Sequence, residues 1–274
     1  MAADRIHLLE HAGLRFDVTD EGPADGAPVL LLHGFPTDRT SWDRVAPLLH
    51  QAGLRTLAPD QRGYSPGARP DSVAAYRLEH LVGDVIALAD ATGHEQVHLV
   101  GHDWGGAVAW LTAGNHADRI ASVTVLSTPH PRALSRAWRT PDQLRRSWYM
   151  AAFQVPVLPE RWLASRFRHL MGRTGLPPRD VERYAARLAT PQAIKPPINW
   201  YRAARSSHVR ARRVTVPATL VWGSHDFALG RRAVELTREH VSGPYKLIEV
   251  DAGHWLPETR PMESAHAIIS RVTS

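Results

Sequence analysis

The sequence contains no cysteine among its 274 residues, which excludes disulfides, a cysteine nucleophile and thiolate ligands for a metal ion. It also lacks a continuous apolar run of about 18 residues, the length that a membrane-spanning helix needs. Its first ten residues show no apolar core of a signal peptide. We therefore expect a cytoplasmic protein with no membrane partner.

Lysine is scarce as well. Of the 33 Lys and Arg residues only Lys195 and Lys246 are lysines, so the formal net charge of +6 comes almost entirely from arginine. The arginines are spread along the chain with small clusters such as residues 210–213, whereas nucleic-acid binding favours clustered basic residues with aromatic residues between them. We interpret the arginines as solvent-exposed surface residues and expect no nucleic-acid partner.

Short apolar runs alternate with helical patterns toward both ends of the chain. Continuous apolar runs suit strands that are buried on both faces, and the alternation is typical of right-handed β–α–β crossovers. The fold class predicted is therefore α/β, with a mostly parallel central sheet flanked by helices. A helix is expected to be capped by Thr40 or Ser41 and to end near residue 51. The main strands are expected at residues 29–32, 55–58, 97–100, 120–126, 218–222 and 245–250.

The pattern changes after residue 129. Residues 130–213 contain no apolar run typical of a strand, but carry tryptophan, tyrosine and phenylalanine residues with prolines between helical patches. We interpret this segment as a helical cap inserted over the sheet. The predicted division is a first core part at residues 1–129, a cap at 130–213 and a second core part at 214–274.

One strand-to-helix turn is predicted to hold the catalytic nucleophile. The apolar run at residues 97–100 leads into Gly101, Asp103 and Gly105, spaced as Gly-x-Asp-x-Gly. In hydrolases such a turn holds a nucleophile above the sheet, and the glycines allow the close backbone contacts. A carboxylate here attacks carbon and forms an ester, and the helix N-terminus keeps it ionised. The alternative interpretation of Asp103 is a plain helix cap.

A nucleophile of this kind needs a base and an orienting acid. His254 follows the final strand, and Asp226 follows the strand at residues 218–222, so the chain order is nucleophile, acid, base. We assign His254 as the base that activates water against the ester, and Asp226 as the acid that fixes its tautomer. A surface-loop histidine and a turn aspartate are the alternatives.

The segment HGFP, residues 33–36, ends the first buried strand. The backbone N–H groups of Phe35 and Trp104 are predicted to form an oxyanion hole for the tetrahedral intermediate of ester hydrolysis. A turn that merely contains a proline is the other interpretation of this segment.

These motifs resemble the α/β-hydrolase superfamily and, within it, the epoxide hydrolases. The resemblance rests on HGFP at residues 33–36, RGYS at 62–65, GHDWGG at 101–106, Asp226 and GHW at 253–255, and it spans nearly the whole chain. It implies two cap tyrosines that hold and protonate the epoxide oxygen. SWYMAAFQVPVLPE places the first at Tyr149, and NWYR places the second at Tyr201. No metal or organic cofactor is implied.

The haloalkane dehalogenases share GHDWGG and are the nearest alternative function. They place an Asn where Phe35 stands to hold the halide, although Trp104 is present. A serine esterase is disfavoured by Asp103, and a non-catalytic ligand-binding protein on this fold is the alternative from a different class. We expect a small, hydrophobic epoxide and water as the partners, because the cap carries residues such as Met150 and Phe153. The oligomeric state, including a homo-oligomer, stays open.

Overall fold

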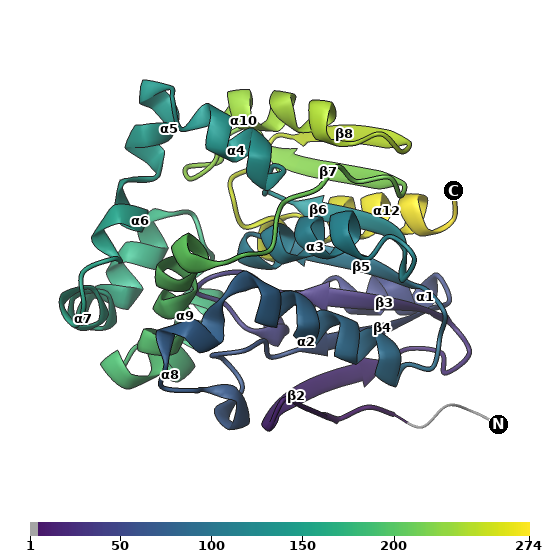
Figure 1. Ribbon diagram of the computed structural model, residues 1–274, viewed down its shortest axis with the longest axis horizontal. Helices are drawn as coiled ribbons and strands as arrows, with labels where there is room; N and C mark the ends of the chain where they lie inside the picture. The colour runs from purple at the N-terminus through teal and green to yellow at the C-terminus, as the bar shows by residue number, and fades with distance from the viewer. Residues whose placement is uncertain (1–4) are drawn as a thin grey trace.

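A single sheet of eight strands organises the computed structural model, which describes residues 5–274 (Figure 1). The strand order is β1-β2-β4-β3-β5-β6-β7-β8. β2 pairs antiparallel with both β1 and β4, and every other neighbouring pair is parallel, which confirms the predicted fold class. The strands are β1 (Leu8–His11), β2 (Leu14–Glu21), β3 (Ala27–Leu32), β4 (Leu54–Pro59), β5 (Val97–His102), β6 (Ile120–Leu126), β7 (Ala218–Gly223) and β8 (Tyr245–Val250).

The central strands separate two apolar layers. Leu30 and Leu32 of β3 pack into a cluster on one face of the sheet, while Val29 and Leu31 pack into a second cluster on the other. Successive strand side chains point to opposite faces, so a strand with both faces covered reads as a continuous apolar run. α2 (Leu78–Ala91) and α3 (Trp104–Asn115) supply residues to the first layer, and α1 (Ala46–Gln51) and α12 (Pro261–Val272) to the second.

The helix expected from Thr40 or Ser41 is divided in two. A short 3-10 helix, η1 (Arg39–Trp42), is capped by Asp38, whose side chain accepts a hydrogen bond from the Thr40 N–H, so the predicted cap was wrong. α1 begins only at Ala46. Pro47 stands in its first turn, where the missing N–H of proline removes no hydrogen bond within the helix. The other short helices of the core are η2 (Pro66–Ala68), η3 (Val73–Tyr76), α10 (Arg231–Leu236), η5 (Thr237–His240) and α11 (Leu256–Thr259).

Between β6 and β7 the chain is helical. Figure 1 shows these helices gathered at one end of the molecule, beyond the edge of the sheet that carries the strands' carboxyl ends. Residues 130–213 are all described and contain no strand. The boundaries at 129/130 and 213/214 stay a predicted division. The helices are α4 (Pro131–Ala137), α5 (Pro141–Arg146), α6 (Trp148–Ala152), α7 (Leu158–Arg173), α8 (Pro178–Leu188), α9 (Pro191–Ala203) and η4 (Ala204–Ser206).

No helix in the described part of the chain combines the length and the apolar character that crossing a bilayer requires.

Candidate active site

Asp103 stands at a sharp turn between β5 and α3. Its backbone has φ 50° and ψ −120°, a conformation that non-glycine residues rarely adopt. The neighbouring glycines make the turn sterically possible: a Cβ on Gly101 would lie 2.3 Å from the Gly105 carbonyl oxygen, and a Cβ on Gly105 would lie 2.3 Å from the Leu32 carbonyl oxygen. The turn is therefore built on close backbone contacts that only glycine permits.

The Asp103 carboxylate has a different neighbour at each oxygen. Oδ1 accepts a hydrogen bond of 2.8 Å from the Phe35 N–H, and Oδ2 lies 3.5 Å from His254 Nε2. Burial raises the pKa of Asp103, but the hydrogen bond and charge of His254 outweigh it, so the pKa falls below its usual value. Within residues 5–274 nothing accepts the Trp104 N–H at the first position of α3, which leaves this donor available.

His254 lies between two carboxylates. Its Nδ1 donates to Asp226 Oδ2 at 2.8 Å, while Asp226 Oδ1 accepts from the N–H groups of Ala228 and Leu229 at 2.8 and 3.0 Å. Burial lowers the pKa of His254, but the charges of Asp226 and Asp103 and their hydrogen bonds outweigh burial and raise this pKa to about 10. At neutral pH the site therefore holds an imidazolium beside the ionised Asp103 carboxylate.

Three residues that the sequence interpretation missed hold this pair in place. The His254 carbonyl oxygen accepts hydrogen bonds from Ser127 Oγ at 2.7 Å and from His102 Nε2 at 2.9 Å. Arg146 of the cap donates to the Asp226 carbonyl oxygen at 2.6 Å. His102 lies inside GHDWGG and Ser127 directly follows β6, so motif position was a signal for both, whereas nothing local marked Arg146.

The loop that carries Phe35 is fixed through the Gly34 carbonyl. This oxygen accepts hydrogen bonds from the N–H and the hydroxyl of Thr37 at 3.1 and 3.0 Å, and it lies 3.0 Å from His33 Nδ1. His33 Nε2 accepts from the Gln61 N–H, so the proton of this neutral ring sits on Nδ1. Burial lowers the pKa of His33 and keeps it neutral. Because Gly34 C=O and Phe35 N–H share one peptide plane, these bonds aim the Phe35 N–H at Asp103.

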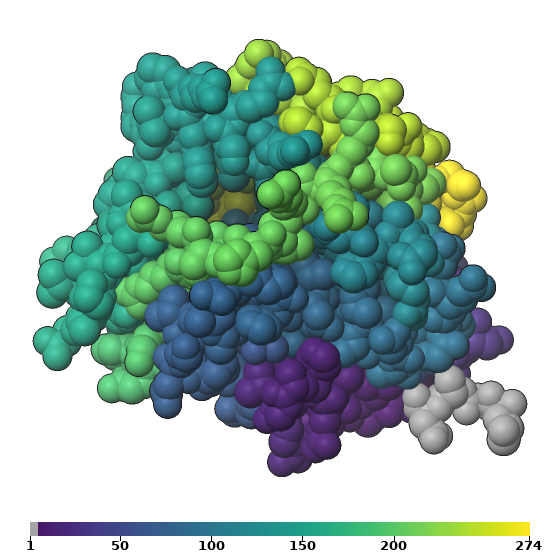
Figure 2. All heavy atoms as spheres, viewed as in Figure 1, coloured from purple at the N-terminus to yellow at the C-terminus, as the bar shows by residue number. Residues whose placement is uncertain are grey.

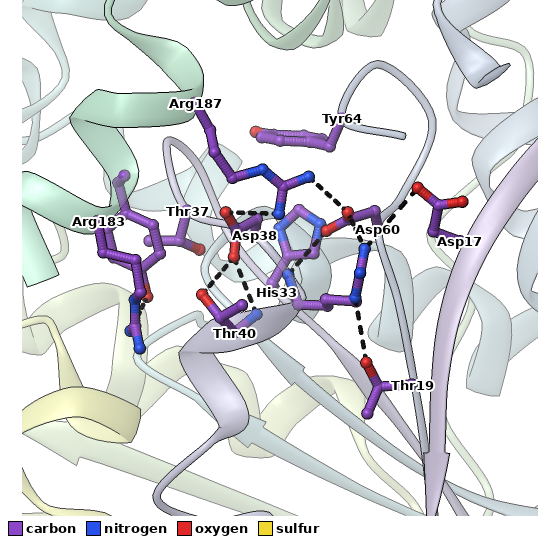
Figure 3. Close-up of polar contacts among 12 residues, drawn as sticks. Asp17, Thr19, His33, Thr37, Asp38, Thr40, Asp60, Tyr64, Arg183 and Arg187 are labelled. Carbon is purple, nitrogen blue, oxygen red and sulfur yellow. Dashed lines mark hydrogen bonds and ion pairs between the residues drawn. The ribbon is translucent and has the colours of Figure 1, made fainter. Parts of the chain in front are cut away.

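Beside this loop, a cap arginine reaches into the core. Figure 3 shows Arg187, from α8, between Asp38 and Asp60 and close to His33. Its guanidinium lies 2.9 Å from Asp38 Oδ2 and 2.7 Å from Asp60 Oδ2, and both carboxylates are buried. The network ties the position of the cap to the loop that carries Phe35.

The two predicted tyrosines both face the cavity that holds Asp103. Tyr149 lies on α6 and Tyr201 on α9, and their ring centroids are 6.0 Å apart. The Gln154 amide donates to the carbonyl oxygens of Met150 and Tyr201, each at 3.1 Å, which joins the two helices. Burial first, and then the Asp103 charge, raises the pKa of Tyr149; burial, followed by the charges of Tyr149 and Asp103, raises that of Tyr201. Both phenols therefore keep their protons at neutral pH.

A cavity of about 490 Å³ lies between the core and the cap. Asp103, His254 and both tyrosines line it, so the structure brings these predicted side chains together, with Asp226 behind His254. Its volume falls in the range of small-molecule sites. No group of three His, Asp or Glu side chains in residues 5–274 is arranged to hold a metal ion. The apolar part of the lining is Phe35, Trp148, Phe153, Trp162, Leu163, Leu170, Met171, Phe227 and Trp255.

A second cavity, of about 500 Å³, lies on the other side of Tyr201. Residues of α4, α6 and η4 line it together with Trp104, and Figure 2 shows a hollow between the teal and green parts of the cap at this place. Tyr201 borders both cavities, so its ring forms part of the wall between them.

Comparison with known proteins gives consistent matches. A sequence model described as "alpha/beta hydrolase fold" matches residues 27–261. Epoxide hydrolase A of Mycobacterium tuberculosis is 32% identical, with 100% of this chain and 98% of the relative covered. Human epoxide hydrolase 4 is 33% identical over 92% of this chain and 74% of its own length. Among solved structures, epoxide hydrolase A from Mycobacterium thermoresistibile superposes with a TM-score of 0.85 at 29% identity, covering 97% of each chain.

Proposed function

We propose that this chain, which belongs to the α/β-hydrolase fold family and within it to the epoxide hydrolases, opens an epoxide to a vicinal diol through a covalent ester on Asp103. The observation that carries the proposal is that an ionised carboxylate and two protonated phenols line one apolar cavity. A carboxylate is the nucleophile for an epoxide carbon, and the phenols are the acids for the oxygen that leaves it.

In the first step the epoxide oxygen accepts hydrogen bonds from Tyr149 and Tyr201. An oxygen of Asp103 forms a bond to a ring carbon, and the bond from that carbon to the epoxide oxygen breaks. The resulting alkoxide takes a proton from one phenol. The tyrosinate regains a proton from the His254 imidazolium through solvent, so that the ester forms beside a neutral imidazole.

The loss of the Asp103 charge on ester formation makes this proton transfer from His254 favourable. Asp103 as an ester is neutral, so it no longer stabilises the positive charge of His254, whose pKa then falls from about 10. In the resting enzyme His254 is a cation that helps to keep Asp103 ionised. In the intermediate it becomes a base. The state of Asp103 therefore sets the role of His254.

In the second step His254 takes a proton from water, and the water oxygen bonds to the Asp103 carbonyl carbon. The N–H groups of Phe35 and Trp104 stabilise the oxyanion, a contribution of about 100- to 1000-fold in rate for each donor. The bond between the acyl carbon and the product oxygen then breaks, and the second proton of the water passes to that oxygen. The diol leaves, with Asp103 ionised and His254 protonated as at the start.

The tyrosines make the test specific to epoxides. Tyr149→Phe and Tyr201→Phe should each slow diol formation from styrene oxide, and the double variant should slow it by about 100-fold or more, since each removes a proton donor. Diol formation is measured beside halide release from a small panel of haloalkanes. A double variant with unchanged diol formation, or a wild-type protein that releases halide but forms no diol, contradicts the proposal.

A dehalogenase needs N–H donors for a leaving halide, and the positions beside Asp103 supply them poorly. Phe35 offers its backbone N–H to Asp103 and has no side-chain donor. The Trp104 indole packs edge-on against the Tyr201 ring, with the ring centroids 4.8 Å apart. The geometry therefore favours epoxide opening over halide release.

A further inference from the structure

The charge of the chain is divided between its parts. Residues 130–213 contain 18 Lys and Arg but only 4 Asp and Glu, a formal charge of +14, whereas the rest of the chain contains 15 and 23, a charge of −8. A net charge of +6 conceals this asymmetry. A field of one sign over one part of a protein concentrates partners of the opposite sign there.

The four cap carboxylates are all paired with arginine: Asp142 with Arg146, Glu160 with Arg202, Asp180 with Arg44 and Arg183, and Glu182 with Arg168. Four exposed arginines on α5 and α7, namely Arg145, Arg161, Arg166 and Arg173, have no carboxylate partner within residues 5–274. The cap therefore offers a surplus of positive charge to an external partner.

Exposed apolar side chains lie on the same helices and on the turn between α6 and α7. We call the following set the apolar rim: Leu144, Trp148, Val155, Val157, Leu158 and Trp162, with exposed fractions between 39% and 66%. Val157 has φ 70°, a strained conformation for a β-branched residue, at the turn that leads into α7. A cluster of large exposed apolar side chains is unusual on a monomer and marks an interaction surface.

On α7 the arginines and the rim residues share one exposed side. On α7, Leu158 and Trp162 are one turn apart, and Arg161 and Arg166 flank them on the exposed side, opposite the buried Leu163 and Phe167. α5, α6 and α7 lie together at the end of the molecule farthest from the chain's C-terminus (Figures 1 and 2). Trp148, Trp162 and Arg145 also line the catalytic cavity, so this face adjoins it.

We propose that this face docks on the surface of a bilayer that contains anionic lipids. Tryptophan and aliphatic side chains lie at the boundary between headgroups and acyl chains, and arginines beside them bind lipid phosphates. Each such arginine contributes about a fivefold gain in partition to an anionic surface. The absence of an apolar spanning segment bears on crossing a membrane and leaves docking on its surface open.

The apolar rim favours a lipid surface over other partners. Nucleic acid pairs its phosphates with arginine and stacks its bases on aromatic rings. It has no aliphatic surface that would cover Leu144, Val155, Val157 and Leu158. A second copy of this chain would bring a cap of charge +14 against another of the same sign. A bilayer matches both the apolar and the cationic side chains.

Vesicle co-sedimentation of the full chain tests the proposal. We expect binding to vesicles of phosphatidylcholine and phosphatidylglycerol, weak binding to phosphatidylcholine alone, and loss of binding in high salt. Arg161→Gln with Arg166→Gln should weaken the partition by about 10- to 30-fold. Val155→Ser with Leu158→Ser, which leaves the charge unchanged, should also weaken it.

A matched control removes the same charge from the core. Arg232→Gln with Lys246→Gln changes two exposed core cations, and the partition should stay within about twofold of the wild type. Equal losses in the cap and core variants, binding unaffected by the serine variants, or no binding to the mixed vesicles would overturn the proposal. So would tighter binding to a DNA duplex than to the vesicles, or a dimer that the serine variants dissociate. None of these measurements depends on turnover, so they stand apart from the proposed reaction.

Discussion

Among single residues, Asp103 and His254 depend on each other's charge. His254 Nε2 lies 3.5 Å from Asp103 Oδ2, and the Asp103 charge is one of the interactions that raise the pKa of His254 to about 10. Asp103→Asn removes that charge without changing the shape, so the pKa of His254 should fall below its wild-type value. An NMR titration of the His254 ring measures this. An unchanged pKa would contradict the base role that we assign to His254 in the intermediate.

The same shift predicts how stability depends on pH. The pKa of His254 is higher in the folded protein than its ordinary value of 6.5, so the folded state binds this proton more tightly. The contribution of His254 protonation to the free energy of unfolding is therefore complete below pH 6.5 and is lost as the pH rises toward 10. The free energy of unfolding of the wild type should fall over this window relative to that of His254→Gln, as urea denaturation measures. Parallel curves for the two proteins would contradict the assignment.

For the helices and strands, the contact between α3 and β3 decides whether the turn at Asp103 can form. A Cβ on Gly105 would meet the Leu32 carbonyl oxygen at 2.3 Å, so Gly105→Ala should cost about 3 kcal/mol or more of stability and remove activity. Gly172 in α7 has no atom within 4 Å of such a Cβ, so Gly172→Ala should stabilise by up to about 1 kcal/mol. Thermal unfolding of both variants checks this, and equal effects would show that the close contact is unimportant.

The docking of α8 on the core gives a second prediction at this scale. Arg187→Ala leaves Asp38 and Asp60 buried with fewer partners and should cost about 2 kcal/mol, since Arg187 is itself 31% exposed and solvent screens part of the loss. Arg168→Ala in α7 removes an exposed pair with Glu182 and should cost less than about 1 kcal/mol. Urea unfolding of the two variants measures the difference. A larger cost for Arg168→Ala would show that Arg187 does not fasten the cap.

What the sequence could reveal at this scale was local. Buried strands appear as apolar runs, and the turn at Asp103 is recognisable because both glycines lie within two residues of the aspartate. The helix predicted from Thr40 or Ser41 was misjudged because Asp38, Thr40 and Ser41 are all good caps, and the fold uses Asp38 as the cap of η1 and starts α1 separately at Ala46. Arg146 was missed because its partner, the Asp226 carbonyl, is 80 residues away and carries no side-chain signal.

Over the whole molecule, both sides of the predicted core–cap division line the cavity, and in the proposed reaction the core supplies the nucleophile and base and the cap supplies the acids. Neither part alone contains the full set of groups that line the cavity. The sequence pattern could separate core from cap, because apolar strand runs stop at the cap. The charge contrast between the two parts was overlooked, because the arginines were judged as small clusters along the chain. These clusters come together only when α5, α6 and α7 fold against one another. The volume of the cavity is likewise a property of the assembled parts.

The central claim is that Asp103 bonds to the substrate, and oxygen labelling tests it most directly. A single turnover is run in ¹⁸O-labelled water with the protein in excess over styrene oxide, and the diol and the peptide containing Asp103 are analysed by mass spectrometry. If water attacks the ester carbonyl, the first diol carries an oxygen from Asp103 and no label, and the Asp103 carboxylate gains the label. Label in the diol with an unlabelled Asp103 would mean that water attacks the epoxide directly, and would contradict the account.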